Sequence, residues 1–201
     1  MDDTIENLLV AWVDILNERY GTHVSANEVH DWSMPQFFPS LTEKQVYAPL
    51  YEDTFWDKVK PIPGANVYLK RLIDDGHNVY IVTSSNYQTL KAKMEKVLFR
   101  FFPMIDWNHV IVTSNKQMIR GDVLVDDGLH NHVGGKYLKI LMDAPHNRNI
   151  NASKHGIIRV KSWAGVYRVV YDYAMTPWTI DTIFGLKGTR NTYRKKDIST
   201  R

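Results

Sequence analysis

The chain reads VYIVTSS at residues 79–85 and VLVDDG at residues 123–128. In each stretch a run of Val, Ile and Leu ends in side chains that can bind phosphate or a cation. Short runs rich in β-branched residues are typical of buried strands. Similar apolar runs lie at residues 110–113, 138–142 and 157–160, and helical patterns at residues 65–74 and 87–101. This alternation predicts an α/β fold with a parallel sheet.

The segment before these runs has a different pattern. Residues 6–20 carry apolar side chains at helical spacing and precede Gly21, which predicts an amphipathic helix. Ser25 with Glu28, and Ser40 with Glu43, have the spacing of capping boxes. Aromatic residues are dense here: Trp32, Phe37, Phe38, Tyr47, Tyr51, Phe55 and Trp56. We expect a small helical subdomain over residues 15–60.

Length and composition narrow the class of protein. The 201 residues fit one domain with a modest insertion, and a hydrophobic content of 44% is enough for a sizeable core. No apolar run approaches the ~20 residues of a membrane helix, and the acidic start does not resemble a signal peptide. The absence of cysteine excludes disulfides and thiolate metal sites and suits a reducing compartment. We therefore predict a cytoplasmic protein with no membrane partner.

The positive charge is concentrated at the C-terminal end. Residues 176–201 hold six basic and two acidic residues, a net charge of +4, whereas the whole chain has +3. A basic tail can bind nucleic acid, but a solvated terminus is the simpler interpretation. We predict no nucleic-acid partner.

Polar side chains follow three of the predicted strands. Thr83 and Ser84 end the first, Lys116 follows the second, and Asp126 and Asp127 end the third. Such positions meet at the carboxyl edge of a parallel sheet, where ligands bind. Hydroxyls donate to phosphate oxygens, an ammonium neutralises them, and carboxylates suit Mg²⁺. Each motif alone is weak, but together they predict a site for a phosphate and a divalent cation.

The order of these motifs resembles a known family. Met1-Asp2-Asp3-Thr4-Ile5, Pro61-Ile62-Pro63-Gly64-Ala65, Thr83-Ser84, Lys116 and Asp126-Asp127 resemble the motifs of the 5'(3')-deoxyribonucleotidases, within the haloacid dehalogenase-like superfamily. The resemblance covers roughly residues 1–170. It implies a three-layer, Rossmann-like parallel sheet built from residues 1–14 and 61–170, with residues 15–60 as a helical cap. Residues 171–201 would form a C-terminal extension with the basic tail.

The resemblance also implies a role for each motif. Asp2 would be the general acid/base and would offer its carbonyl to Mg²⁺. Thr83, Ser84 and Lys116 would bind the phosphate, with Lys116 also a catalytic residue. Asp126 and Asp127 would form the acidic part of the metal site, the second of the pair being the metal ligand by the family pattern.

The implied activity is Mg²⁺-dependent hydrolysis of (deoxy)ribonucleoside monophosphates through an aspartyl-phosphate intermediate. In the family pattern the nucleophilic Asp stands immediately before Met1, at the end of a strand between those that carry Thr83 and Asp126. We expect that strand and that Asp upstream of Met1, and activity to require them. The alternative is an inactive nucleotide-binding or interaction protein. Whether the chain forms a homodimer is left open.

The remaining predictions concern contacts with the substrate base and the histidines. Phe55 and Trp56 stand where the resemblance places aromatics that contact the base, although they could equally form the core of the cap. His130 and His132 lack a third ligand at suitable spacing and are interpreted as a loop. His146 and Asn147 are given no role.

Overall fold

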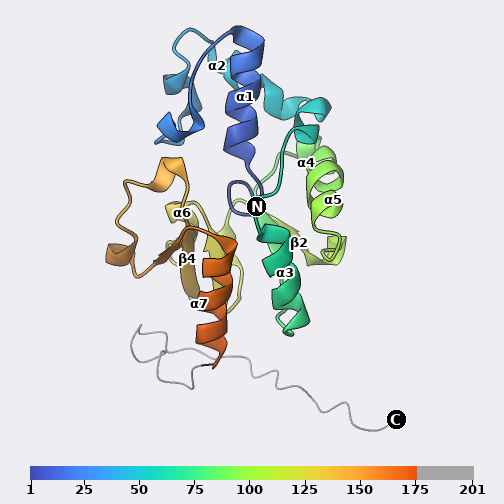
Figure 1. The fold of residues 1–201 in the computed structure, drawn as a ribbon, viewed down its shortest axis with the longest axis vertical. Helices are drawn as coiled ribbons and strands as arrows, with labels where there is room; N and C mark the ends of the chain where they lie inside the picture. The colour runs from blue at the N-terminus through green and yellow to red at the C-terminus, as the bar shows by residue number, and fades with distance from the viewer. Residues whose placement is uncertain (176–201) are drawn as a thin grey trace.

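The fold comes from a computed structural model that describes residues 1–175 (Figure 1). The basic residues of the tail lie outside the described residues. The α-helices are α1 (Leu8–Tyr20), α2 (Glu43–Tyr47), α3 (Ala65–Asp74), α4 (Tyr87–Lys93), α5 (Phe99–Phe101), α6 (Leu129–His132) and α7 (Trp163–Met175). A π-helical segment, Met94–Leu98, joins α4 to α5. The strands are β1 (Ile81–Thr83), β2 (Val110–Val112), β3 (Val123–Asp126), β4 (Leu138–Met142) and β5 (Ile158–Val160).

Within residues 1–175 each pair of neighbouring strands is parallel. β1 pairs with β2, with Ile81 opposite Val110, and β3, β4 and β5 form a second sheet in that order. The predicted α/β fold with parallel strands is therefore confirmed. The strands with Thr83 and Asp126 lie in different sheets, and the resemblance places a further strand between these two.

Residues 15–60 contain helices and 3₁₀ turns and no strand. The first predicted capping box is present, because the Ser25 N–H donates to Glu28 over 2.7 Å. The second prediction is wrong: the box is formed by Thr42 and Gln45, since α2 begins at Glu43 and its first turn places Gln45 where it can accept from the Thr42 N–H. α1 and α2 lie together above the strands in Figure 1. The boundaries of the cap stay a prediction.

The N-terminal residues are held in the main core. Met1 is 4% exposed, and its carbonyl accepts the N–H groups of Thr4 and Ile5. Trp163, at the start of α7, donates its indole N–H to the Thr4 carbonyl over 2.8 Å. α7 packs beside α3 (Figure 1). The first motif is thus fixed between the helical segment and the strands.

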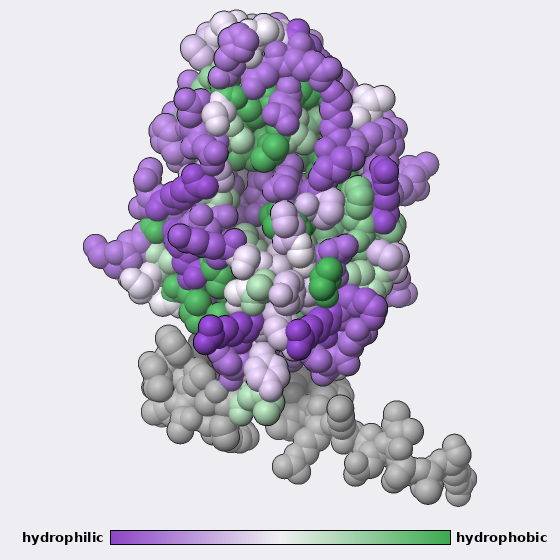
Figure 2. Space-filling model, viewed as in Figure 1, coloured by the Kyte–Doolittle hydropathy of each residue, from purple (hydrophilic) through white to green (hydrophobic). Residues whose placement is uncertain are grey.

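The surface is mixed in character. Figure 2 shows polar and charged side chains over much of one face, with hydrophobic side chains between them. Within residues 1–175, no helix has the length and hydrophobicity needed to cross a lipid bilayer.

Candidate active site

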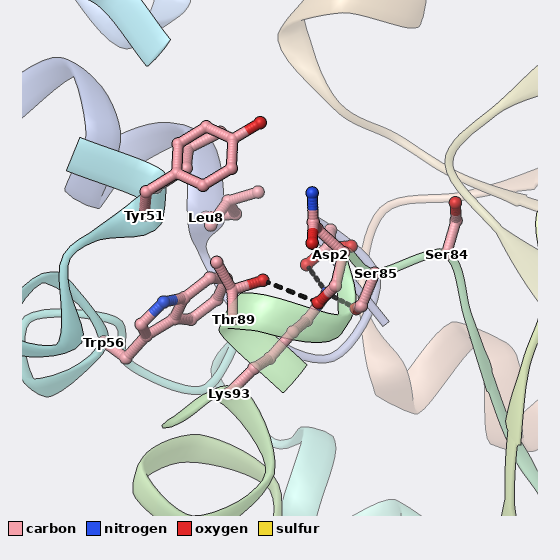
Figure 3. Close-up of a pocket in the computed structure, with 10 residues that line it drawn as sticks. Asp2, Leu8, Tyr51, Trp56, Ser84, Ser85, Thr89 and Lys93 are labelled. Carbon is pink, nitrogen blue, oxygen red and sulfur yellow. Dashed lines mark hydrogen bonds and ion pairs between the residues drawn. The ribbon is translucent and has the colours of Figure 1, made fainter. Parts of the chain in front are cut away.

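A buried lysine joins the first two motifs. The Lys93 ammonium lies 2.5 Å from one carboxylate oxygen of Asp2 and 2.7 Å from the other. It also donates to the hydroxyls of Thr83 and Ser85, each over 3.1 Å. Figure 3 shows Lys93 together with Asp2 and Ser85. The sequence reasoning missed Lys93, which α4 delivers to the carboxyl end of β1. Its position was a usable signal, because a lysine four residues before Val97 lies on the apolar face of that helical pattern.

Two neighbours hold the Asp2 carboxylate in its charged form. Burial favours the neutral form, but the charge of Lys93 outweighs it, so the pKa of Asp2 lies below its usual range. Glu6 is fully buried, and burial together with the Asp2 charge raises the pKa of its carboxyl well above the usual value. The raised pKa favours the neutral form of the Glu6 carboxyl beside the charged Asp2 carboxylate.

The third and fourth motifs form a second ion pair. The Lys116 ammonium lies 2.6 Å from one oxygen of Asp126, and both side chains are buried. The other oxygen accepts the Gly128 N–H and the Asn131 amide. Burial works against the charge, but Lys116 and these donors hold the pKa of Asp126 below its ordinary value. With its oxygens occupied by donors, Asp126 is suited to orienting Lys116.

Asp127 has a different environment. One of its oxygens accepts the Thr4 hydroxyl over 3.2 Å, and that hydroxyl lies 3.1 Å from the Asp2 carbonyl. The Asp2 carbonyl and the Asp127 carboxylate, which the resemblance assigns to Mg²⁺, therefore both contact the Thr4 hydroxyl. A carboxylate and a carbonyl are the oxygen donors that Mg²⁺ prefers, so the residues present fit the implied metal.

Asp3 and His146 also reach Asp127. The His146 Nε2 lies 2.8 Å from Asp127, and ligand atoms of Asp3, Asp127 and His146 all lie within 4.8 Å of one another. Burial and the negative charge of Asp127 raise the pKa of Asp3 to about 7. Asn147 donates to the Asp127 carbonyl over 2.9 Å. The sequence analysis did not group His146 and Asn147 with Asp127, and the turn after β4 brings both to the carboxyl end of β3.

A pocket opens beside the Asp2–Lys93 pair. Trp56, Tyr51 and Leu8 line it across from Asp2 and Ser84 (Figure 3). The pairing of Phe55 with Trp56 as base contacts is corrected for Phe55, which is fully buried and does not line the pocket. Phe55 packs edge-on against Trp56 inside the helical segment, because neighbours in the 3₁₀ turn Asp53–Asp57 point in different directions.

Two further sets of residues from the sequence analysis are Ser84 and the histidine pair His130 and His132. The hydroxyl that contacts Lys93 belongs to Ser85, while Ser84 is exposed at the pocket rim. His130 and His132 lie on the short helix α6 and not in a loop. Burial lowers the pKa of His132, whose Nε2 lies 3.4 Å from the Asp126 carbonyl.

The ion pairs converge on the start of the chain. The amino group of Met1 is buried, and its pKa is lowered by burial and then by the charge of Lys116. Asp2, Asp126 and Lys93 act on the same nitrogen. Charged groups of the first, third and fourth motifs, together with Lys93, therefore act on this one buried nitrogen.

A parallel α/β fold that brings carboxylates, a hydroxyl and lysines to its strand ends is typical of a phosphoric monoester hydrolase. Residues 1–175 match the family described as "5' nucleotidase, deoxy (Pyrimidine), cytosolic type C protein". The chain belongs to this family, and the predicted family and enzyme class are confirmed.

Three curated relatives share most of the chain. A 5'(3')-deoxyribonucleotidase of Bacillus subtilis (strain 168) is 34% identical over 170 residues, 84% of this chain and 94% of its own length. A protein of the same name from Bacillus phage SPbeta has the same identity and coverage. One from Clostridium acetobutylicum is 28% identical over 163 residues, covering 81% of this chain and 87% of the relative.

Proposed function

We propose that this chain is built to hydrolyse deoxyribonucleoside monophosphates with Mg²⁺, in the cytoplasm. The observation that carries the proposal is the convergence of Lys93, Lys116 and the Thr83 hydroxyl with Asp2 at the carboxyl ends of β1 and β3. Two ammonium groups and a hydroxyl match the oxygens of a phosphate dianion. The names of the relatives supply the substrate class.

The Asp2–Lys93 pair explains how one carboxylate can act as acid and base. Without substrate, Lys93 keeps Asp2 ionised. A bound phosphate competes for the Lys93 ammonium and adds negative charge, and both effects raise the pKa of Asp2. Asp2 can then protonate the leaving ribose oxygen and later accept a proton from water. Thr83 and Ser84 would help to position the phosphate.

The nucleophile of this scheme is an aspartate joined to Met1. The charges of both lysines, Asp2 and Asp126 act on the Met1 nitrogen, which supports placing a residue attached there beside the phosphate. Attack on phosphorus by its carboxylate would release the nucleoside and form an aspartyl-phosphate, which water hydrolyses. Asp127 and the Asp2 carbonyl would hold Mg²⁺, with Asp126 supporting the site. The cation supplies neutralisation of phosphoryl charge.

The test compares the 201-residue chain with a version extended by an apolar strand that ends in Asp directly before Met1. We expect the extended chain to release phosphate from deoxynucleoside monophosphates in Mg²⁺ and to lose that activity in EDTA. An extended variant ending in Asn is the matched control. Nucleotide binding without turnover in every version would favour the inactive nucleotide-binding protein. Absence of both binding and turnover would overturn the proposal.

Lys93→Met should weaken the binding of inorganic phosphate to the 201-residue chain about 10- to 100-fold. The reason is that hydrogen bonds to charged groups are worth ~1.5 to 3 kcal/mol. Isothermal titration calorimetry measures the change, and Lys91→Met, an exposed lysine on the same helix, is the control. Equal phosphate affinity in the Lys93 variant would remove Lys93 from the phosphate site.

Trp56→Leu should weaken binding of a deoxynucleoside monophosphate about 5- to 100-fold and leave inorganic phosphate binding nearly unchanged. Stacking of a base on an aromatic ring is worth ~1 to 3 kcal/mol, whereas phosphate alone does not reach the ring. Trp107→Leu, an exposed tryptophan away from the pocket, is the control. A parallel loss for both ligands would indicate a packing role for Trp56.

A further inference from the structure

One arginine of β5 ties together the turn that follows β4. Arg159 lies in the middle of β5, and its side chain is 22% exposed. The guanidinium donates to the Asp143 carboxylate over 2.6 Å and to the side-chain oxygen of Asn147 over 2.7 Å. It also donates to the backbone carbonyls of Asn147 and Ile150, over 2.9 and 2.8 Å. A single side chain therefore holds this turn at its beginning, middle and end.

The same turn reaches the acidic motif at the end of β3. The Asn147 side chain is fully buried, and its amide donates to the carbonyls of Asp127 and Met142, over 2.9 and 2.7 Å. The residue before it, His146, lies 2.8 Å from the Asp127 carboxylate. Hydrogen bonds thus run from Arg159 through Asn147 to Asp127.

The position of Asp127 depends on this turn more than on its own strand. β3 ends at Asp126, so Asp127 lies just beyond the ladder of paired strands. Among the described residues, the side chains that hydrogen-bond to Asp127 are those of Thr4, His146 and Asn147, and the last two come from the turn. A shift of the turn would therefore move the supports of Asp127.

The chemistry of this network requires an arginine. A guanidinium is planar and presents its donors in a rigid fork, so it can satisfy a carboxylate, an amide oxygen and two carbonyls at once. A lysine ammonium is a compact charge with fewer donors, and it cannot reach all four acceptors together. Carbonyls that lose a donor in a mostly buried turn must move towards water or another partner. Replacement of Arg159 by lysine would therefore release part of the turn.

We propose that Arg159 is a positioning residue of the phosphatase site, which holds Asp127 in place through Asn147. The inference rests on the proposed function, in which the Asp127 carboxylate is a ligand of Mg²⁺. Mg²⁺ demands near-ideal octahedral geometry, so a small displacement of one ligand weakens its binding. Thr83 and Lys93 lie on β1 and α4, and β1 belongs to the other sheet. The phosphate side of the site should therefore not depend on Arg159.

The first test measures Mg²⁺ binding without turnover. Calorimetry of the chain extended by a strand that ends in Asp should show Mg²⁺ binding ~10-fold weaker in Arg159→Lys, the lower end of the range for groups that orient metal ligands. Inorganic phosphate, titrated without Mg²⁺, should bind the variant and the unchanged chain equally. Arg168→Lys is the same substitution at an exposed arginine of α7, and it should leave both affinities unchanged. Urea unfolding shows whether each variant is folded.

The second test follows the route through Asn147 in the 201-residue chain without metal. Nuclear magnetic resonance should show slow solvent exchange of the Asn147 side-chain amide, which donates to two carbonyls, and exchange at least ~10-fold faster in Arg159→Lys. Asp143→Asn leaves the guanidinium its bonds to Asn147 and Ile150, so it should accelerate this exchange less.

Three results would overturn the inference: unchanged Mg²⁺ affinity in a folded Arg159→Lys chain, equal losses of Mg²⁺ and phosphate affinity, or unchanged exchange of the Asn147 amide. Equal losses would indicate a general structural role. If Arg159→Lys does not fold, Asp143→Asn decides, and it should weaken Mg²⁺ binding measurably and phosphate binding not at all. Weaker Mg²⁺ binding by Arg159→Lys in a chain that releases no phosphate would support the positioning role and reject the phosphatase proposal.

Discussion

Asp2→Asn should lower turnover ~10²- to 10⁴-fold in the chain that carries an aspartate before Met1. This is the range that a positioned general acid/base contributes, and asparagine cannot donate and accept the proton. The variant keeps a similar side-chain shape, so the Glu6 contact and the backbone carbonyl stay available. Steady-state phosphate release from a deoxynucleoside monophosphate measures the loss.

Two controls distinguish a loss of proton transfer in Asp2→Asn from a loss of folding. Asp14→Asn on α1 is the matched control, because Asp14 is exposed and lies outside the site. A substrate with a good leaving group, such as p-nitrophenyl phosphate, needs less protonation, so Asp2→Asn should lose less activity with it. An equal loss with both substrates, or full activity with the nucleotide, would contradict the acid/base role.

Asp126→Asn should lower the free energy of unfolding by ~3 to 5 kcal/mol. The substitution leaves the Lys116 ammonium, 9% exposed, without its carboxylate, and an uncompensated buried charge is strongly destabilising. Urea unfolding of the 201-residue chain measures the change. Asp74→Asn, which removes an exposed pair with Lys70, should leave the free energy of unfolding nearly unchanged.

A double variant separates the charge from the shape of the site. Adding Lys116→Met to Asp126→Asn removes the unpaired ammonium and should recover part of the lost stability. If Asp126→Asn alone is as stable as the unchanged chain, water reaches the Lys116 ammonium. No recovery in the double variant would place the loss in the hydrogen bonds from Gly128 and Asn131.

The strands and helices of the structure lie close to the ranges that the pattern of side chains predicts. The helical pattern at residues 65–74 corresponds to α3, and the runs at 123–126 and 138–142 to β3 and β4. The run at 79–83 begins as a strand only at Ile81. Periodicity predicts elements well because burial on one face is a local property of the sequence, whereas the ends depend on which backbone groups find a partner.

Contacts between residues far apart in the sequence could not be predicted from periodicity. Lys93 was missed as a site residue because a lysine in a helix is usually solvated, and its place on the apolar face of α4 does not tell which carboxylate it meets. Only the tertiary structure places it on Asp2. His146 was missed for the same reason: its partner Asp127 is 19 residues away, and the turn after β4 decides the contact. Phe55 and Trp56 are adjacent in sequence, but the 3₁₀ turn buries one and turns the other to the pocket.

The sequence by itself determined the α/β class, the family and the four motifs, because apolar periodicity and the types of side chain at strand ends are written in the order of residues. Only the tertiary structure decided which charges face each other. It pairs Lys93 with Asp2 and Lys116 with Asp126, and it leaves Asp127 to His146. The physical reason is that electrostatic energy depends on distance and burial, and both are set by how segments far apart in the chain pack together.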